Sequence, residues 1–170
     1  MLFKIFVSFL IKLLYDLPLM ILGLFIIPVG LLFEKNNHLP TLCWLWDNDK
    51  YGCNGGDFWK RTRGENTSFI SKFIWLALRN PTYNSSRYVL GTTSSGIISF
   101  YGNERVSRNT EEGWYWAEDG WKWEFHYIKA YNNKTKCIKF RAGWKIMNKM
   151  KGDVCSFVFS PNPFVKYSGK

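Results

Sequence analysis

The sequence predicts an α+β protein: an N-terminal membrane-associated helical segment, then one mainly antiparallel sheet domain with a short packed helix. Three observations support this fold class. Between Asp16 and Glu34 the chain carries no charged residue. From Tyr88 onward, apolar and polar residues alternate with the period of two that is typical of strands. Between these regions, residues 66–81 repeat apolar side chains at helical spacing.

The apolar run over residues 13–33 is expected to attach the chain to a membrane. A spanning helix needs about 20 predominantly apolar residues, with a lower limit of roughly 17. Lys4, Ser8 and Lys12 precede the run four residues apart, which places them on one face of an amphipathic helix. Because a proline and a glycine near the end of the run can interrupt a helix, a re-entrant or interfacial segment stays open beside a single span. A signal peptide and a buried core helix are the other interpretations.

Composition divides the chain into the apolar segment 1–34, an aromatic and glycine-rich connector over 35–65, and a helix-plus-meander domain over 66–170. All nine tryptophans lie after residue 33, so a chain without residues 1–33 is expected to fold as a soluble domain. The net charge is +10 and lies almost entirely in that remainder. This excess favours an anionic partner, such as lipid head groups or nucleic acid. A solvated basic surface stays open beside it as the alternative. Lysines that follow the segment favour a cytoplasmic domain.

Three aspartates in the connector raise the question of a cation site. Counted from Asp47, Asp49 and Gly52 occupy positions three and six of a calcium-binding EF-hand loop, but Phe58 stands where the loop requires glutamate. A turn in which Asp and Asn side chains bond to their own backbone is therefore expected, with no metal ion. Asp47, Asp49 and Asp57 remain weak candidates for metal ligands.

The four cysteines show no C-x-x-C pair, which favours reduced structural thiols. A zinc site made by His38, Cys43 and Cys53 matches no common ligand spacing.

The helix predicted over residues 66–81 has a clear beginning and end. Asn66, Thr67 or Ser68 can cap its first turn, and Asn80-Pro81 stops it. Its apolar stripe is expected to pack on the sheet.

The sheet is predicted from two hairpins. A turn at Asp119-Gly120 would pair Trp116 with Trp123, and a turn at Asn132-Asn133 would pair Phe125 with Phe140. Both registers put the same aromatic face inward. Further strands are expected over residues 96–101 and 154–159.

The opposite face of this sheet is predicted to be open, polar and basic, and we expect it to bind an anionic partner. Its binding residues are expected to be Lys122, Lys139, Arg141, Lys145, Tyr115 and His126.

Three motifs resemble a family of small tailed-phage proteins of unknown function. They are LPTLCWLWDNDKYG, with its key residues at Trp44 to Asn48; WLALRNP, at Trp75 to Pro81; and RAGWKI, at Gly143 to Lys145, followed by PNPF. The resemblance covers most of residues 39–164. It implies a phage or prophage origin, and it supplies no activity, so no catalytic residue is carried over.

The expected function is therefore that of a phage- or prophage-encoded, membrane-associated accessory or interaction protein without catalytic activity or cofactor. Membrane lipid, anionic head groups or nucleic acid, and a phage or host protein are the expected partners. A nucleic-acid-binding module or a virion structural component, located in the virion, are the alternatives. An enzyme is disfavoured because the sequence has no nucleophile elbow, phosphate loop or zinc-helix motif.

Overall fold

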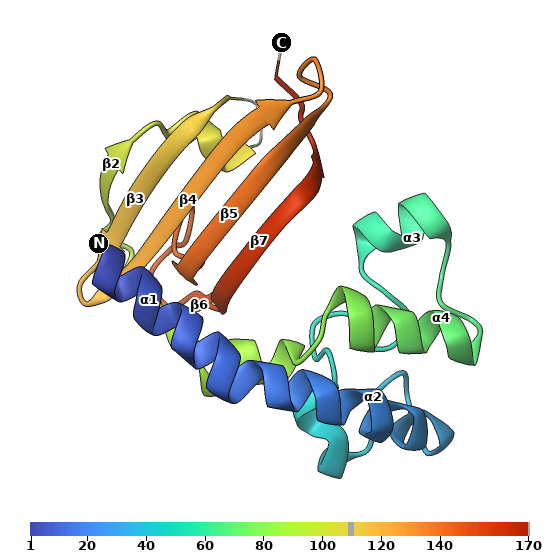
Figure 1. Ribbon diagram of the computed structural model, residues 1–170. Helices are drawn as coiled ribbons and strands as arrows, with labels where there is room; N and C mark the ends of the chain where they lie inside the picture. The colour runs from blue at the N-terminus through green and yellow to red at the C-terminus, as the bar shows by residue number, and fades with distance from the viewer. Residues whose placement is uncertain (109–110, 170) are drawn as a thin grey trace. The chain divides into compact units, whose positions relative to one another are not determined.

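The computed structural model describes residues 1–108 and 111–169 (Figure 1). The fold is α+β, as predicted, with a long apolar N-terminal helix and a mainly antiparallel sheet. The chain forms two compact units, Met1–Lys12 with Leu90–Lys170, and Leu13–Val89. The units therefore meet after Lys12 and after Val89, whereas composition divided the chain after residues 34 and 65.

The N-terminal helix runs continuously from Leu2 to Leu32, with a mean hydropathy of 2.1. It consists of α1 (Leu2–Ile11), the π-helical turn η1 (Lys12–Asp16) and α2 (Leu17–Leu32). Pro28 lies inside α2 without ending it. The sequence left open an interruption at Pro28 and Gly30, and the structure shows none: the segment is one helix, not a re-entrant hairpin.

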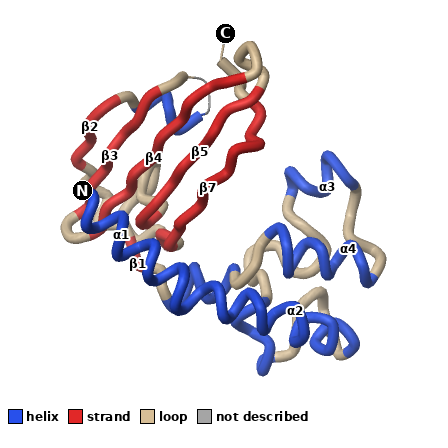
Figure 2. Tube along the Cα trace, in the orientation of Figure 1, coloured by secondary structure: helices blue, strands red, loops and turns tan. Residues whose placement is uncertain are grey.

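The first unit is built on a five-stranded antiparallel sheet in the order β2-β3-β4-β5-β7 (Figure 2). A two-stranded sheet pairs β1 with β6, and a 3-10 helix, η5 (Glu104–Arg108), precedes β3. The strands are β1 (Thr92–Thr93), β2 (Ser99–Gly102), β3 (Gly113–Asp119), β4 (Lys122–Tyr131), β5 (Lys136–Trp144), β6 (Val154–Cys155) and β7 (Phe157–Lys166).

The predicted meander is present, but both predicted registers are wrong by two residues. The first hairpin turns at Gly120 and Trp121, so Trp116 pairs with Phe125. Gly120 has φ 63°, the conformation that glycine takes readily at the first central position of a two-residue hairpin turn. The second hairpin needs four connecting residues, so Phe125 pairs with Ala142. Because side chains alternate with a period of two, a shift of two residues leaves each side chain on its predicted face.

Both faces of the sheet carry a buried cluster. On the aromatic face, Trp116 and Trp123 stack with ring centroids 4.9 Å apart, and Ile5 of α1 packs against them. On the other face, Tyr115 and Ile128 pack with residues of η5, the segment after β5 and the C-terminal segment. The prediction that this second face is open to solvent is wrong, since further residues cover it.

In the second unit, short helices pack against one side of α2. The short helices of this unit are η2 (Thr41–Trp46), α3 (Asp57–Arg63), α4 (Phe69–Phe73), and the π-helical η3 (Ile74–Arg79) and η4 (Ser85–Val89). The predicted helix over 66–81 is thus α4 with η3, and Ser68 caps it by accepting a hydrogen bond from the Ser71 backbone N–H (3.2 Å). Its buried Trp75 and Leu76 share a core with Ile27 and Leu31 of α2. The prediction that this helix packs on the sheet is therefore wrong.

Candidate functional site

The polar residues of α1 face the protein, and most of its large apolar residues, though not Ile5, are exposed. Lys4 forms an ion pair with Glu118 (Nζ–Oε1 3.3 Å) and lies 5.5 Å from the ring centroid of Trp116. Ser8 is only 2% exposed, whereas Leu2 and Phe3 are more than three-quarters exposed. A surface helix of a soluble protein has the opposite arrangement, with its apolar stripe against the core. This face of α1 is therefore suited to an apolar environment.

The α2 helix repeats this arrangement in the second unit. Its protein-facing side has the buried glycines Gly23 and Gly30 together with Ile27. A Cβ atom added to Gly23 would lie 2.6 Å from the Trp46 ring, so the two elements approach as closely as glycine allows. Its outward-facing side, here called the bare face of α2, consists of Leu17, Ile21, Leu22, Leu24, Phe25, Val29 and Leu32, all at least 40% exposed.

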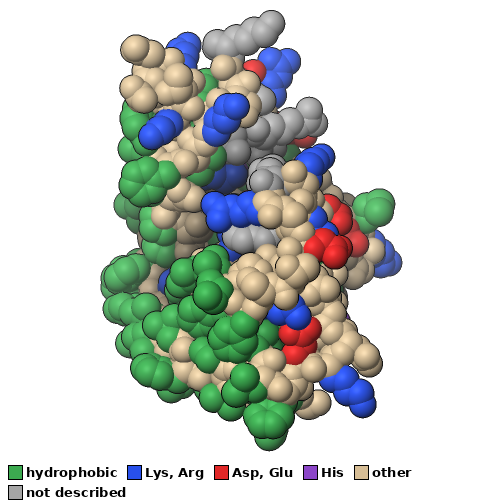
Figure 3. Space-filling view, turned by 90° about the vertical axis from the view of Figure 1, so that its right-hand side faces the viewer, with side chains coloured by type: hydrophobic (Ala, Val, Ile, Leu, Met, Phe, Trp, Pro, Cys, Tyr) green, Lys and Arg blue, Asp and Glu red, His purple; other side chains and the backbone are tan. Residues whose placement is uncertain are grey.

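Polar contacts hold α2 to the rest of its unit at both ends. Near the start, Thr82 Oγ1 donates a hydrogen bond to the buried carboxylate of Asp16, and Trp46 Nε1 donates to the Leu19 carbonyl (2.7 Å). Just past the end, Lys72 pairs with Glu34 (2.7 Å). Protein therefore covers one side of α2 along its whole length, about 27 Å from Asp16 to Glu34 at 1.5 Å per residue. Figure 3 shows hydrophobic side chains gathered over the lower part of the view.

A second feature of this unit is a polar cluster at His38, Asp47 and Asp49. One potential ligand atom from each residue lies within 4.8 Å of the others, and His38 Nδ1 is 2.9 Å from Asp47 Oδ2. Asn84 Nδ2 and Trp44 Nε1 donate hydrogen bonds to the two carboxylate oxygens of Asp49 (2.7 and 3.2 Å). Burial raises the pKa of Asp47, which is 3% exposed, above its ordinary value.

The cluster changes the set of metal-ligand candidates predicted from sequence. It keeps Asp47 and Asp49 and adds His38, whereas Asp57 lies outside it, in the first turn of α3. Within the described part of the chain, neither Cys43 nor Cys53 belongs to this group. All four cysteines are free, and burial raises the pKa of Cys53 to about 12, which keeps it a thiol at neutral pH.

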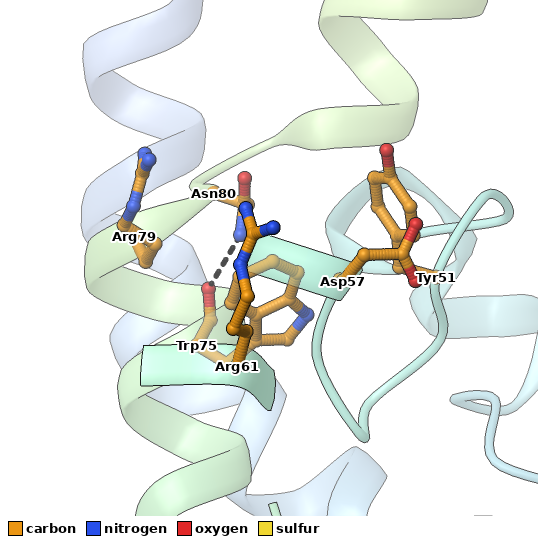
Figure 4. A pocket seen from close by; sticks show the side chains of 7 residues that line it. Tyr51, Asp57, Arg61, Trp75, Arg79 and Asn80 are labelled. Carbon is orange, nitrogen blue, oxygen red and sulfur yellow. Dashed lines mark hydrogen bonds between the residues drawn. The ribbon is translucent and has the colours of Figure 1, made fainter. Parts of the chain in front are cut away.

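Asp57 instead lines a pocket of about 380 Å³ (Figure 4). The other lining residues are Tyr51, Gly56, Arg61, Trp75, Arg79 and Asn80. Asn80 Nδ2 is held by a hydrogen bond to the Trp75 carbonyl (3.3 Å). Two arginines and one aspartate line the pocket, so it offers charges of both signs and selects no class of ligand by charge.

The predicted anionic-partner site on the sheet is largely buried. Tyr115, His126 and Lys122 are 0%, 1% and 7% exposed, while Lys139, Arg141 and Lys145 are half-buried. Lys122 is engaged with Asp119 (3.2 Å) and the Thr93 carbonyl (2.6 Å). Such side chains do not form an open basic face, so the predicted surface is absent.

The structure instead gathers three of these residues around Glu124, which the sequence analysis did not include among the binding residues. The Tyr115 hydroxyl and the Arg141 guanidinium donate to its carboxylate (2.6 and 2.5 Å), and the Met147 backbone N–H donates to the other oxygen (2.9 Å). His126 Nδ1 lies 3.1 Å from the Tyr115 hydroxyl. Burial, together with the positive charges of Lys139 and Arg141, lowers the pKa of His126 to about 3. These groups form an internal polar network.

Comparisons with other proteins give a family but no activity. Neither the curated proteins nor the solved structures contain a significant match to the chain. A family profile described as a family of unknown function (DUF7338) matches residues 1–169. The match covers nearly the whole chain, from the apolar helix to the last strand, and the protein is thus a member of the DUF7338 family.

Proposed function

We propose that this protein is a membrane-associated accessory protein that lies on one surface of a bilayer, with the apolar faces of α1 and α2 inserted into the lipid. The observation that carries the proposal is the bare face of α2, which exposes seven large apolar side chains while the opposite side holds the polar contacts. Helices that lie in the plane of a membrane have one apolar face and one face turned to polar groups.

The same observation weighs against the other interpretations of the N-terminal helix. A core helix would be mostly buried, yet 17% of its most apolar window is buried. A cleaved signal peptide would contribute nothing to the mature fold, whereas Ile27 and Leu31 belong to the core of the second unit. In a spanning helix, the Asp47 region that packs along α2 would lie at hydrocarbon depth, where buried charges are expensive.

Electrostatics and the sequence resemblance extend the proposal. A net charge of +10 favours a bilayer rich in anionic lipid, because each basic residue near such a surface is worth about 1 kcal/mol. The resemblance to tailed-phage proteins adds a phage or prophage origin, and a phage or host protein is the partner that this origin suggests. Lysines that follow the apolar segment favour the cytoplasmic side of the membrane.

Vesicle flotation of the full-length protein tests the attachment. Replacing Phe25 and Leu32 of the bare face by serine should leave the fold intact and reduce vesicle binding roughly a hundredfold or more, since burying each such side chain contributes about 1.5–3 kcal/mol. Ile97→Ser is the matched control, because Ile97 is 79% exposed but lies outside the helix. Unchanged flotation of the double variant would show that the bare face of α2 is not the attachment site.

Labelling from outside the vesicle distinguishes a helix in the plane from a spanning helix. In a chain whose native cysteines are replaced, a single cysteine at Leu2 or at Phe33 is treated with a membrane-impermeant maleimide. An interfacial helix predicts equal labelling at both ends, because both lie on the outer side. Labelling at one end alone would show that the helix crosses the bilayer.

A further inference from the structure

The polar cluster of the second unit has the composition of a metal site. His38 supplies an imidazole nitrogen, and Asp47 and Asp49 supply carboxylate oxygens, all within 4.8 Å of one another. Two ligands bound tetrahedrally to zinc at about 2.0–2.2 Å lie roughly 3.4 Å apart, so small side-chain shifts bring these atoms to a shared ion. The 2.9 Å contact between His38 and Asp47 already holds two of them together.

Asp47 provides an independent reason to place a cation here. Its carboxylate is 3% exposed, and Oδ1 has no hydrogen-bond partner among the residues that the structure describes. Its neighbour in the cluster, His38, has a side chain that is 42% exposed, so the contact between them is open to water on one side. A buried carboxylate is expensive unless it is paired or coordinates a metal. An ion at the cluster would neutralise it directly.

The residues around the cluster already orient its ligands. The Asn84 side chain both donates to Asp49 Oδ1 and accepts from the Asp49 backbone N–H (3.1 Å), while Trp44 Nε1 donates to Oδ2. Asn84 also donates to the Trp44 carbonyl (2.9 Å). Such outer partners fix ligand direction in metal sites. They join the end of η2 and the residues after it, up to Asp49, to the residues that follow η3.

We propose that His38, Asp47 and Asp49 bind one zinc ion, with water completing the coordination. Imidazole with carboxylates suits zinc, whereas calcium and magnesium prefer oxygen ligands alone. Three protein ligands leave a fourth position, and the exposed side of Asp49 and His38 gives solvent a path to it.

Zinc titration of the untagged, full-length, chelator-treated protein in detergent tests this inference. One zinc per chain is expected, and His38→Gln and Asp49→Asn should each lose most of the affinity. Asn84→Ala, which removes an outer partner, should weaken binding about 10–100-fold. Asp57→Asn is the matched control, because Asp57 belongs to the same unit but lies outside the cluster. This variant should bind zinc with unchanged affinity.

The cobalt-substituted protein provides a readout that does not depend on folding stability. Cobalt bound by nitrogen and oxygen should show visible bands without the near-ultraviolet charge transfer that thiolate ligands produce. A thiolate band would place the ion on the cysteines and overturn the assignment, as would the absence of zinc binding or equal binding by the His38 and Asp49 variants. These experiments use detergent-solubilised protein, so their outcome does not depend on whether the protein binds vesicles.

Discussion

At the scale of single residues, the buried network around Glu124 shows how ionisable side chains stabilise the interior of the sheet. Glu124 is completely buried, and it accepts hydrogen bonds from Tyr115, Arg141 and the Met147 backbone. A buried ion pair is strongly destabilised when one partner is removed, because the other charge is then left uncompensated. The network is therefore a place where conservative changes have large effects.

Glu124→Gln is expected to destabilise the protein by about 3–5 kcal/mol, because it leaves the Arg141 charge without a carboxylate. Chemical unfolding followed by circular dichroism measures the effect. Glu112→Gln is the control, since Glu112 pairs with Lys129 at the surface (2.7 Å) and exposed ion pairs contribute little to stability. Equal losses in the two variants would mean that the Glu124 network adds no more than a surface pair.

His126 is expected to make the fold sensitive to acid. Its pKa is about 3 in the folded protein and 6.5 in the unfolded chain, so below pH 6.5 the unfolded chain takes up a proton that the folded chain does not. Stability should therefore fall as pH drops from 6.5 toward 3, by at most about 1.4 kcal/mol per pH unit from this residue. His126→Gln should remove that slope in unfolding experiments between pH 6.5 and 5, and His38→Gln should retain it.

At the scale of elements, the aromatic face of the sheet is held by a stacked pair of tryptophans. Trp116 and Trp123 are 8% and 4% exposed, and their rings are nearly parallel, at 6°. Trp116→Ala and Trp123→Ala should each destabilise the fold by about 3–5 kcal/mol, as truncation of large buried aromatics does. Trp114→Ala, on the same face of β3 but 47% exposed, should cost less than half as much in thermal or chemical unfolding.

The two sheet faces show which features of the sheet could be predicted from the sequence and which could not. Period-two alternation correctly separated the residues of the two faces, because it depends only on backbone geometry. It could not show that the face with Tyr115, Glu124 and Arg141 is also buried, because side chains that satisfy one another look like a solvent-exposed face. The exact position of each turn was missed, because the residue pairs Asp119-Gly120 and Asn132-Asn133 are each compatible with more than one loop length.

The candidate metal cluster was only partly visible in the sequence. Asp47 and Asp49 drew attention because they are close in the chain and match part of a known loop. His38 and Asn84 reach them from 9 and 35 residues away, through the packing of η2 against the helices that follow. Nothing in the local pattern encodes that separation, so the cluster is visible only in the folded unit.

At the scale of the whole molecule, the N-terminal helix belongs to both compact units. Its first turns pack Ile5 against the sheet, and its later turns place Ile27 and Leu31 in the core of residues 13–89. The expectation that residues 1–33 are a separable anchor is therefore inconsistent with the packing. The apolar helix is structural as well as membrane-binding in the proposed function.

Removal of residues 1–33 is accordingly expected to abolish the cooperative thermal transition of the second unit and to expose the aromatic face of the sheet. The truncated chain should aggregate, which size-exclusion chromatography and differential scanning calorimetry against the full chain in the same detergent would detect. A truncated protein that remains monomeric and melts with undiminished enthalpy would show that the helix is an appendage.

The ion pair between Lys4 and Glu118 has a consequence for the order of folding during synthesis. The two residues are 114 positions apart, so the first helix leaves the ribosome long before the strands that cover its polar side have been translated. Contacts of such long range form late, and apolar surface that waits for them is prone to aggregate. If the protein binds membranes as proposed, the exposed apolar side of the nascent helix meets lipid first. Membrane binding is then expected to precede completion of the sheet and to keep the emerging chain from aggregating.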